Sequence, residues 1–165
     1  IGVKIWIVGG ALRDYLTDEI VTDIDFVINE DIKKFAKEIS KNNIIIKDNY
    51  IKYKTISLII NKKEYHITSF RKDLISYGRS ALVDIAASLN DDVKRRDFTI
   101  NSLYLDSKGN LTDFLNGEND LIKRKLVFIG NPVERIEEDC LRILRFCRFS
   151  GNFDYKMPKL SLIHI

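Results

Sequence analysis

A short apolar run that ends in two glycines and continues into a helix most constrains how this chain can fold. Residues 4–8 form an apolar, β-rich run, Gly9-Gly10 interrupt it, and residues 11–16 begin a helix. A strand-to-helix turn exposes free backbone N–H groups, and glycine lets a phosphate approach them closely. Arg13, in the first helical turn, adds a guanidinium for phosphate oxygens. Gly10 and Arg13 are therefore candidate phosphate-binding residues, with an ordinary tight turn as the alternative.

The next predicted strand, residues 23–28, carries two acids at its start. Asp23 and Asp25 are two positions apart, and alternate strand residues point to the same face, so the two carboxylates can converge. Such a pair suits Mg²⁺, which completes its shell with water and substrate phosphates. Paired metal ions can activate an attacking hydroxyl and stabilise a leaving oxygen. Two solvated acids at a polar strand entrance are the alternative.

The rest of the chain continues as a mixture of strand and helix patterns. We expect helices over 31–41, 91–103 and from Pro132 onward, and strands over 55–60, 65–70 and 111–114. The polar passage 71–89 is interpreted as a mobile loop. In the last helix, the predicted apolar stripe consists of Ile136, Cys140, Ile143, Leu144 and Cys147. The pattern predicts an α+β (mixed α/β) fold with a small mixed sheet that leads into a helical extension.

Composition limits the function classes. A net charge of +3 over 165 residues excludes binding of nucleic acid through bulk charge, so any polyanion must meet local clusters of Lys and Arg. Cys140 and Cys147 lie seven positions apart in one predicted helix, which is poor geometry for a disulfide. We expect two reduced, semi-buried thiols in a cytoplasmic protein without a membrane span or signal peptide.

The segment Lys94–Asn101 offers a second set of polar groups. Asp97 and Asn101 are four positions apart and would share a helix face, with Arg96 adjacent. An acceptor, an amide and a guanidinium could together hold a ribose and a phosphate. A solvated, salt-bridged helix surface is the alternative.

The predicted final helix carries an acid and a row of arginines. Asp139 and Arg142 are three positions apart, and Arg142, Arg145 and Arg148 form a curving cationic row. Intrahelical ion pairs, worth a few tenths of a kcal/mol, are the simpler interpretation. The functional interpretation is that Asp139 and Arg142 hydrogen-bond the edge of a base, while the remaining arginines meet phosphates.

Together these segments resemble the class II tRNA nucleotidyltransferases and bacterial poly(A) polymerases. The matching residues are Gly9-Gly10-Ala11-Leu12-Arg13-Asp14, Asp23-Ile24-Asp25, Arg95-Arg96-Asp97-Phe98-Thr99-Ile100-Asn101 and Glu138-Asp139-Cys140-Leu141-Arg142. Asp73 with Gly78-Arg79 also resembles a flexible-loop motif of that family. The resemblance covers residues 4–153, nearly the whole chain.

The resemblance implies a polymerase-β-like nucleotidyltransferase head over residues 1–130 and the start of a helical neck over 131–155. Residues 156–165 lack helical periodicity and capping signals, so we expect an atypical tail there. It also implies roles for ten residues: Asp23 and Asp25 as Mg²⁺ ligands, Gly10 and Arg13 on the triphosphate, Arg96 and Asp97 on the nucleotide with Asp97 near the ribose, Asp139 and Arg142 on the base, and Arg145 and Arg148 completing the nucleotide pocket. The expected reaction adds CMP and AMP from CTP and ATP to the 3′ end of tRNA, through attack of the RNA 3′-hydroxyl on the α-phosphate. A poly(A) polymerase or an A- or CC-adding relative is one alternative, and a catalytically inert nucleotide-binding remnant is another.

Two features depart from the family pattern. His66 stands where the family commonly places a carboxylate, with Glu64 or Asp73 as substitute acids. The chain also lacks most of the long helical body and tail that grip tRNA, so we expect a truncated fragment with weak, salt-dependent affinity for tRNA. A separate partner chain is one possible source of the missing body.

Overall fold

A computed structural model describes residues 2–42, 44–48, 50–77, 80–85 and 88–153, with only the backbone described for 72–77, 80–85, 152 and 153. A mixed sheet runs through the molecule in the order β3-β4-β5-β2-β1-β8-β9. Its strands are β1 (Ile5–Val8), β2 (Asp25–Ile28), β3 (Ile45–Lys47), β4 (Thr55–Ile60), β5 (Lys63–Ser69), β8 (Leu103–Asp106) and β9 (Leu111–Asp113). The β2–β5 pair is parallel and the other neighbouring pairs are antiparallel. The predicted mixed α/β fold is confirmed.

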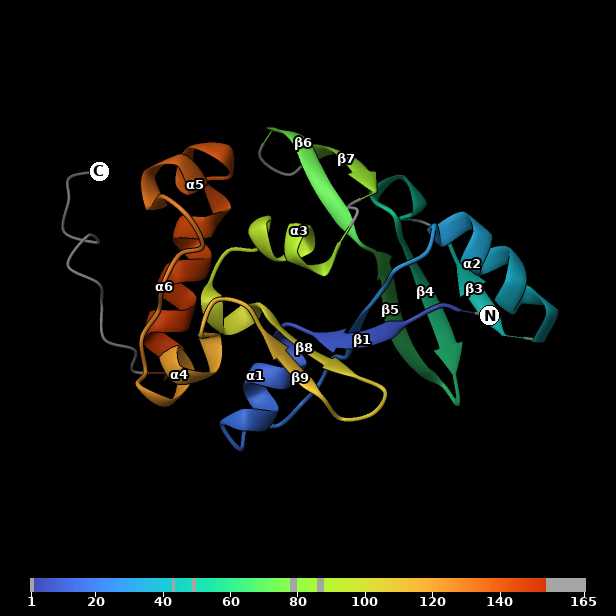
Figure 1. Ribbon diagram of the computed structural model, residues 1–165, viewed down its shortest axis with the longest axis horizontal. Helices are drawn as coiled ribbons and strands as arrows, with labels where there is room; N and C mark the ends of the chain where they lie inside the picture. The colour runs from blue at the N-terminus through green and yellow to red at the C-terminus, as the bar shows by residue number, and fades with distance from the viewer. Residues whose placement is uncertain (1, 43, 49, 78–79, 86–87, 154–165) are drawn as a thin grey trace.

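Successive side chains of β2 point to opposite faces of the sheet, and one of these faces is apolar. Ile28 points to the face where Ile56, Leu58 and Ile67 form a buried cluster. Helix α2 (Ile32–Ile39) packs on this cluster, and the carboxylate of its N-cap residue Asp31 accepts hydrogen bonds from two backbone N–H groups of the first turn. The short 3₁₀ segment η1 (Ser40–Asn42) follows α2, and a second one, η2 (Ile51–Tyr53), lies between β3 and β4. Figure 1 shows α2 at one end of the molecule, against β3 and β4.

The opposite face of the sheet carries Val27 and, at the start of β2, Asp25. Val27 packs with Val8, Phe70 and Val93 in a second buried cluster, to which α3 (Leu89–Lys94) contributes. Helix α1 (Gly10–Leu16) follows β1 directly, as the sequence predicts. Asp25 therefore sits at the polar margin of a face whose centre is apolar.

The prediction of a loop over 71–89 is wrong for most of that passage. Strands β6 (Arg71–Tyr77) and β7 (Ser80–Ile85) form a separate antiparallel hairpin, whose register shifts between Asp73 and Ile75. Such a shift interrupts the two-residue alternation that identifies a strand in sequence. Gly78 and Arg79, part of the resemblance to a flexible-loop motif, lie outside the described residues.

The helix predicted over 91–103 is also wrong beyond its first turns. Helix α3 ends at Lys94, and a 3₁₀ turn, η3 (Thr99–Asn101), leads into β8. The Asp97 carboxylate accepts the Phe98 N–H, and the extended Phe98 bridges to Phe128. A side-chain acceptor and a tertiary strand contact thus replace the helical hydrogen bonds.

The helix predicted from Pro132 is two helices, α5 (Pro132–Glu138) and α6 (Leu141–Phe153). Asp139 adopts an extended conformation between them, and its carboxylate accepts the Leu141 N–H at 3.0 Å. The predicted apolar stripe is therefore wrong: Cys140, Leu144 and Cys147 are exposed, and the expectation of semi-buried thiols fails with it.

The buried face of α6 carries two aromatic side chains. Phe146 and Phe149 pack with Phe98, Ile100, Leu121 and Leu126 beside α4 (Gly117–Ile122). Gly117 allows close approach of α4, since a Cβ there would lie 2.2 Å from the Thr99 carbonyl oxygen. Residues 98–126 and α6 thus share one core, and the predicted division at residue 130 stays a prediction.

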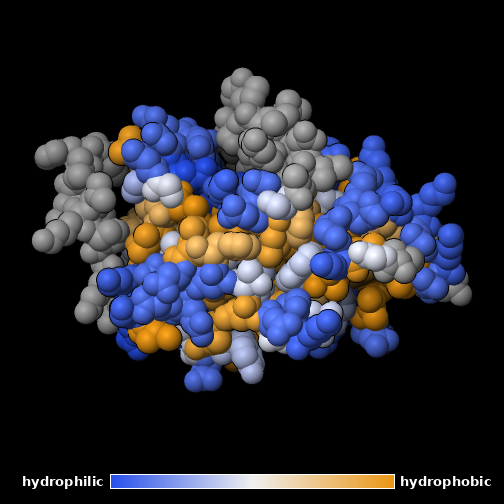
Figure 2. All heavy atoms as spheres, viewed as in Figure 1, coloured by the Kyte–Doolittle hydropathy of each residue, from blue (hydrophilic) through white to orange (hydrophobic). Residues whose placement is uncertain are grey.

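The molecular surface mixes polar and apolar regions. On the face that Figure 2 shows, a band of hydrophobic residues runs across the middle, with hydrophilic residues above and below it and over the end that carries α2. Among the helices of the described ranges, none combines the length and apolar character needed to cross a membrane.

Candidate functional site

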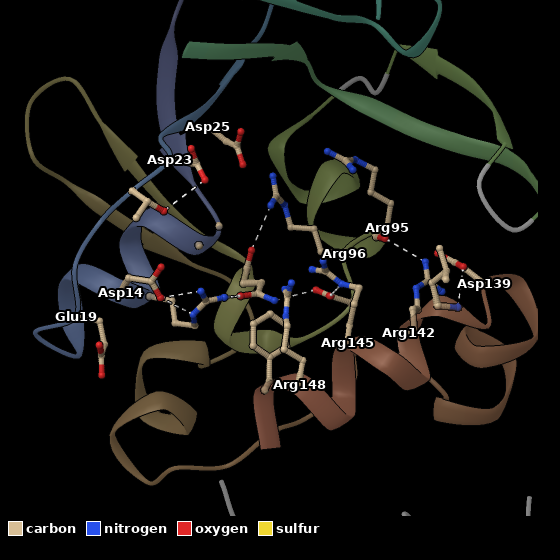
Figure 3. Close-up of a pocket in the computed structure, with 18 of the residues that line it drawn as sticks. Asp14, Glu19, Asp23, Asp25, Arg95, Arg96, Asp139, Arg142, Arg145 and Arg148 are labelled. Carbon is tan, nitrogen blue, oxygen red and sulfur yellow. Dashed lines mark hydrogen bonds and ion pairs between the residues drawn. The ribbon is translucent and has the colours of Figure 1, made fainter. Parts of the chain in front are cut away.

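A single cleft of about 880 Å³ is lined by all ten residues that the sequence predicts for the site (Figure 3). They are Gly10, Arg13, Asp23, Asp25, Arg96, Asp97, Asp139, Arg142, Arg145 and Arg148. The acids near β2 lie on one side of the cleft, and the arginines of α6 extend from the other. Segments far apart in sequence therefore meet at one site, whereas the role of each residue remains a proposal.

The turn between β1 and α1 needs glycine at its first position. Gly9 has φ 71°, a left-handed conformation that side chains rarely adopt, and a Cβ there would lie 3.4 Å from a guanidinium nitrogen of Arg96. Arg13 is largely buried behind the turn and donates to Asn101 Oδ1 and Asp14 Oδ1, both at 2.8 Å. The turn thus brings bare backbone to the cleft wall and holds Arg13 in a fixed orientation.

Asp23 and Asp25 lie side by side at the cleft, with their carboxylates on the same side of β2 (Figure 3). The only polar contact of Asp23 within the described residues is the Thr22 hydroxyl at 3.3 Å, and the Asp25 carboxylate has no hydrogen bond or ion pair there. Desolvation raises the pKa of Asp25 above its usual value, and Asp23 adds to this, while His66 and Arg96 oppose it. Two clustered carboxylates without a cationic hydrogen-bond or ion-pair partner among the described residues are suited to a cation.

The donor set at this position fits Mg²⁺. Mg²⁺ in proteins commonly takes one or two carboxylates and fills the rest of its shell with water and substrate phosphates. In the described ranges no group of three or more His, Cys, Asp or Glu side chains could hold a metal ion. The pair Asp23 and Asp25 thus matches a metal held jointly with a phosphate ligand and does not resemble a closed protein cage.

Asp92, absent from the predicted site, orients the arginines at the centre of the cleft. This fully buried carboxylate accepts from Arg95 Nε at 2.7 Å, Arg96 Nη2 at 3.1 Å and the Tyr104 hydroxyl at 2.9 Å. Burial disfavours its charged form, but the two arginines and Tyr104 outweigh burial and lower its pKa to about 2. Asp92 is therefore ionised at neutral pH and fixes two guanidiniums that line the cleft.

Asp97 and Asn101 meet as predicted, although no α-helix joins them. Asn101 Nδ2 donates to Asp97 Oδ1 at 3.1 Å, and Arg145 Nε donates to Asp97 Oδ2 at 2.5 Å. Burial raises the pKa of Asp97, but Arg145 and the hydrogen bonds from Asn101 and the Phe98 N–H lower it overall. The Asp97–Arg145 pair connects the segment before η3 to α6 across the cleft.

Arg142 is held by the helix break. It is buried, and its Nη1 donates to the Arg135 carbonyl oxygen at 2.6 Å and to Glu138 Oε2 at 2.7 Å. Arg135 in turn pairs with Glu138 and donates to the backbone carbonyl oxygens of Arg95 and Arg96 at 2.7 and 2.9 Å. These bonds attach the break between α5 and α6 to the backbone at Arg95 and Arg96, and Asp139 lines the cleft beside it.

Several lining residues were not selected from sequence. Asn101 and Arg95 belonged to a recognised segment but were left out of the site, and Phe149 was not considered. Arg13 and Arg148 lie 4.7 and 4.8 Å from the centre of the Phe149 ring. An aromatic residue directly after Arg148 was the available hint.

His66 lies directly beside Asp25, because β2 and β5 pair in parallel with these residues in register. Its Nδ1 is 3.0 Å from the hydroxyl oxygen of Ser57 on β4. Of the two substitute acids, Glu64 forms an exposed ion pair with Lys47 at 3.1 Å, and the side chain of Asp73 lies outside the described residues. His66 therefore occupies the position at which a third acid was expected.

Residues 5–127 match the Poly A polymerase head domain family. CCA-adding enzymes from Streptococcus gordonii and Enterococcus faecalis are 38% and 34% identical over 97% and 99% of this chain. The chain spans about 40% of the length of these relatives.

Solved structures show the same fold. The Bacillus stearothermophilus CCA-adding enzyme in complex with CTP superposes with a TM-score of 0.85 and 27% identity, over 96% of this chain and 37% of that one. A tRNA nucleotidyltransferase complexed with a primer tRNA and an incoming ATP analog gives 0.77 and 31%, over 96% and 44%. The family match covers most of the chain and includes the strand, turn and carboxylate pair of the cleft, so the chain belongs to the Poly A polymerase head domain family.

Proposed function

We propose that this chain is the catalytic head of a metal-dependent nucleotidyltransferase that adds CMP and AMP to the 3′ end of tRNA. The observation that carries the proposal is the single cleft. In it, two carboxylates without a cationic partner among the described residues lie opposite the arginines of α6, and the glycine turn lines the same cleft. The CCA-adding relatives and the structures solved with CTP, an ATP analog and tRNA support the same substrates.

The proposed nucleotide site uses the two sides of the cleft differently. The backbone at Gly10 and the guanidinium of Arg13 bind the triphosphate, with Arg145 and Arg148 contacting it from α6. Arg96 and Asp97 contact the sugar and phosphate of the nucleotide. This assignment is supported by rigid orientation, since Arg96 and Asp97 are each held by charged partners, Asp92 and Arg145.

Asp23 and Asp25 would hold Mg²⁺. Bound Mg²⁺ supplies Lewis-acid activation of the attacking hydroxyl and stabilises charge on the leaving oxygen. The protein contributes two carboxylates that lack a cationic partner among the described residues, so no internal ion pair has to break when the metal binds.

Asp139 and Arg142 are the proposed readers of the base. A carboxylate accepts and a guanidinium donates, so the pair can match the donor and acceptor groups on the edge of cytosine or adenine. Both line the cleft, and Arg142 is fixed by Glu138 and the Arg135 carbonyl oxygen. Fixed groups discriminate between bases better than mobile ones, because less ordering is needed on binding.

The proposal is tested by Mg²⁺-dependent incorporation of CTP and ATP, supplied separately, into a tRNA that lacks its 3′ terminal nucleotides. Asp23→Ala and Asp25→Ala should abolish incorporation, while Glu118→Gln, an exposed acid on α4, should not. Incorporation that survives both substitutions would show the metal assignment to be wrong.

The same assay separates the alternative within the family. The matched family takes its name from poly(A) polymerase, and an enzyme of that type would extend RNA with ATP alone. Addition of CMP before AMP supports CCA addition instead. The exposed, unpaired thiols of Cys140 and Cys147 support a reducing compartment, and we propose the cytoplasm.

A further inference from the structure

A second cavity of about 430 Å³ adjoins the first and shares four lining residues with it: Asp25, Arg71, Arg95 and Arg96. The cavities therefore meet at the proposed metal carboxylate and at three arginines. The glycine turn, Arg13 and the α6 arginines line only the first cavity. A triphosphate would thus bind in the first cavity, which leaves the second without an assigned ligand.

The floor of the second cavity is one face of the sheet, and strand register determines its composition. Asp25 pairs with His66, and Val27 pairs with Thr68, across the parallel β2–β5 ladder. Thr68 in turn pairs with Thr55 on β4, and their hydroxyl oxygens lie 2.9 Å apart. Residues opposite one another on neighbouring strands share a face. A row of hydrogen-bonding groups therefore extends away from Asp25 across the floor.

The remaining groups suit one unpaired ribonucleotide. Tyr50 lines the cavity with 51% of its surface exposed, which leaves its ring accessible to a stacked base. The imidazole of His66 uses Nδ1 toward Ser57, and its other nitrogen has no hydrogen-bond partner in the part of the chain that the structure describes. Arg71, whose Nη1 donates to the Tyr53 carbonyl oxygen at 3.0 Å, adds positive charge at the junction of the cavities.

We propose that this second cavity binds the 3′-terminal nucleoside of the RNA acceptor strand, with Tyr50 stacking on its base and the Thr68 hydroxyl contacting its ribose. The inference rests on the proposed nucleotidyl transfer. In that reaction the attacking hydroxyl approaches the α-phosphate roughly in line with, and opposite to, the leaving pyrophosphate. An acceptor nucleoside in the second cavity presents its 3′-hydroxyl at Asp25, on the side away from Arg13 and the α6 arginines.

The test compares direct binding and kinetics in the full chain. The binding probes are two fluorescent tRNA acceptor-stem RNAs that end before the final adenosine, one with a normal terminal nucleotide and one abasic at that position. The unmodified chain should bind the normal RNA about tenfold more tightly at low salt, because a stacked base contributes strongly to single-strand binding. Tyr50→Ala should remove this preference, and Tyr50→Phe should retain it.

The kinetic arm measures KM for the RNA and for ATP. Tyr50→Ala should raise the RNA KM about tenfold and Thr68→Val by a smaller factor, while the KM for ATP stays unchanged. Tyr15→Ala, at another exposed tyrosine that lines neither cavity, is the control and should change neither KM. Thermal melting verifies that each variant is folded.

The two proposals fail in distinguishable ways. If the unmodified chain binds both RNAs equally, or if Tyr50→Ala raises the KM for ATP and leaves that for RNA unchanged, the acceptor site is wrong. If the chain adds no nucleotide but prefers the RNA with a terminal base through Tyr50, the acceptor site stands and the proposed catalysis does not.

Discussion

The acids on the two sides of the main cleft differ in whether arginines form ion pairs with them. Asp23 and Asp25 have no cationic hydrogen-bond or ion-pair partner among the described residues, and desolvation raises the pKa of Asp25. Asp92 and Asp97 are also carboxylates in or beside the cleft, but arginines lower their pKa values despite burial. Asp23 and Asp25 are therefore available to a ligand, whereas Asp92 and Asp97 form ion pairs with arginines that line the cleft.

This difference separates residues that bind from residues that position. An internally compensated carboxylate stabilises the fold and restricts the motion of its guanidinium partners. An uncompensated carboxylate contributes little to stability, and its retention at a cleft indicates a role with a ligand. Substitutions on the two walls should therefore affect different measurements.

The largest expected effect is on catalysis. Asp25→Asn should lower nucleotide incorporation by on the order of 10³-fold, since it removes one of two proposed metal ligands and its charge stabilisation. The melting temperature should not fall, because within the described residues the Asp25 carboxylate has no hydrogen bond or ion pair to lose. A loss of activity accompanied by equal destabilisation would erase the contrast between the walls.

The second prediction concerns stability instead of catalysis. Asp92→Asn should lower the free energy of unfolding by about 3 kcal/mol, because it leaves the half-buried Arg95 and Arg96 without their counter-charge. Denaturant unfolding measures this change in the free energy of unfolding. Asp91→Asn, at the adjacent and more exposed acid, should cost no more than about 0.5 kcal/mol. Equal effects at both positions would contradict the role given to Asp92.

The third prediction concerns acid. The pKa of Asp92 is about 2 in the folded protein against 3.8 for a free aspartate, so folding favours its ionised form. The resulting stabilisation, roughly 2 kcal/mol, is complete above about pH 4 and is lost as pH falls toward 2. Unfolding measured across this window should show a shallower decline for Asp92→Asn than for the unmodified chain.

The fourth prediction addresses base choice at the helix break. Arg142→Ala should reduce the discrimination between CTP and ATP by about tenfold, because one of two groups that match the base edge is lost. The ratio of kcat/KM for the two nucleotides is the measurement. Arg124→Ala, an exposed arginine beyond α4, should preserve the ratio. Unchanged selectivity in Arg142→Ala would reject the reading role.

The smallest expected effect tests the departure at His66. His66→Glu should raise turnover about two- to threefold, since it places a third carboxylate in register with Asp25 and favours deprotonation of the attacking hydroxyl. His66→Gln supplies no acid and should give no increase. No change or a loss in His66→Glu would reject the idea of a missing catalytic acid.

Local patterns predicted the parts of the fold that depend on neighbouring residues. The order of strand, Gly9-Gly10 turn and helix was correct, as were the helix predicted over 31–41 and the strands predicted over 55–60 and 65–70. The β6–β7 hairpin was missed because its register shift interrupts the alternation. The break at Asp139 was missed because the helical periodicity of the sequence continues through it, whereas the backbone of Asp139 is extended.

The sequence by itself determined which chemical groups are available: a backbone without side chains at Gly9-Gly10, two acids on alternate positions, and several arginines. Only the tertiary structure decided which of these charges stay open and which become paired. Asp92 meets Tyr104, and Asp97 meets Arg145, through contacts between distant segments. Strand pairing likewise places His66 beside Asp25. Such pairings follow from burial and desolvation in the assembled core, which local periodicity does not encode.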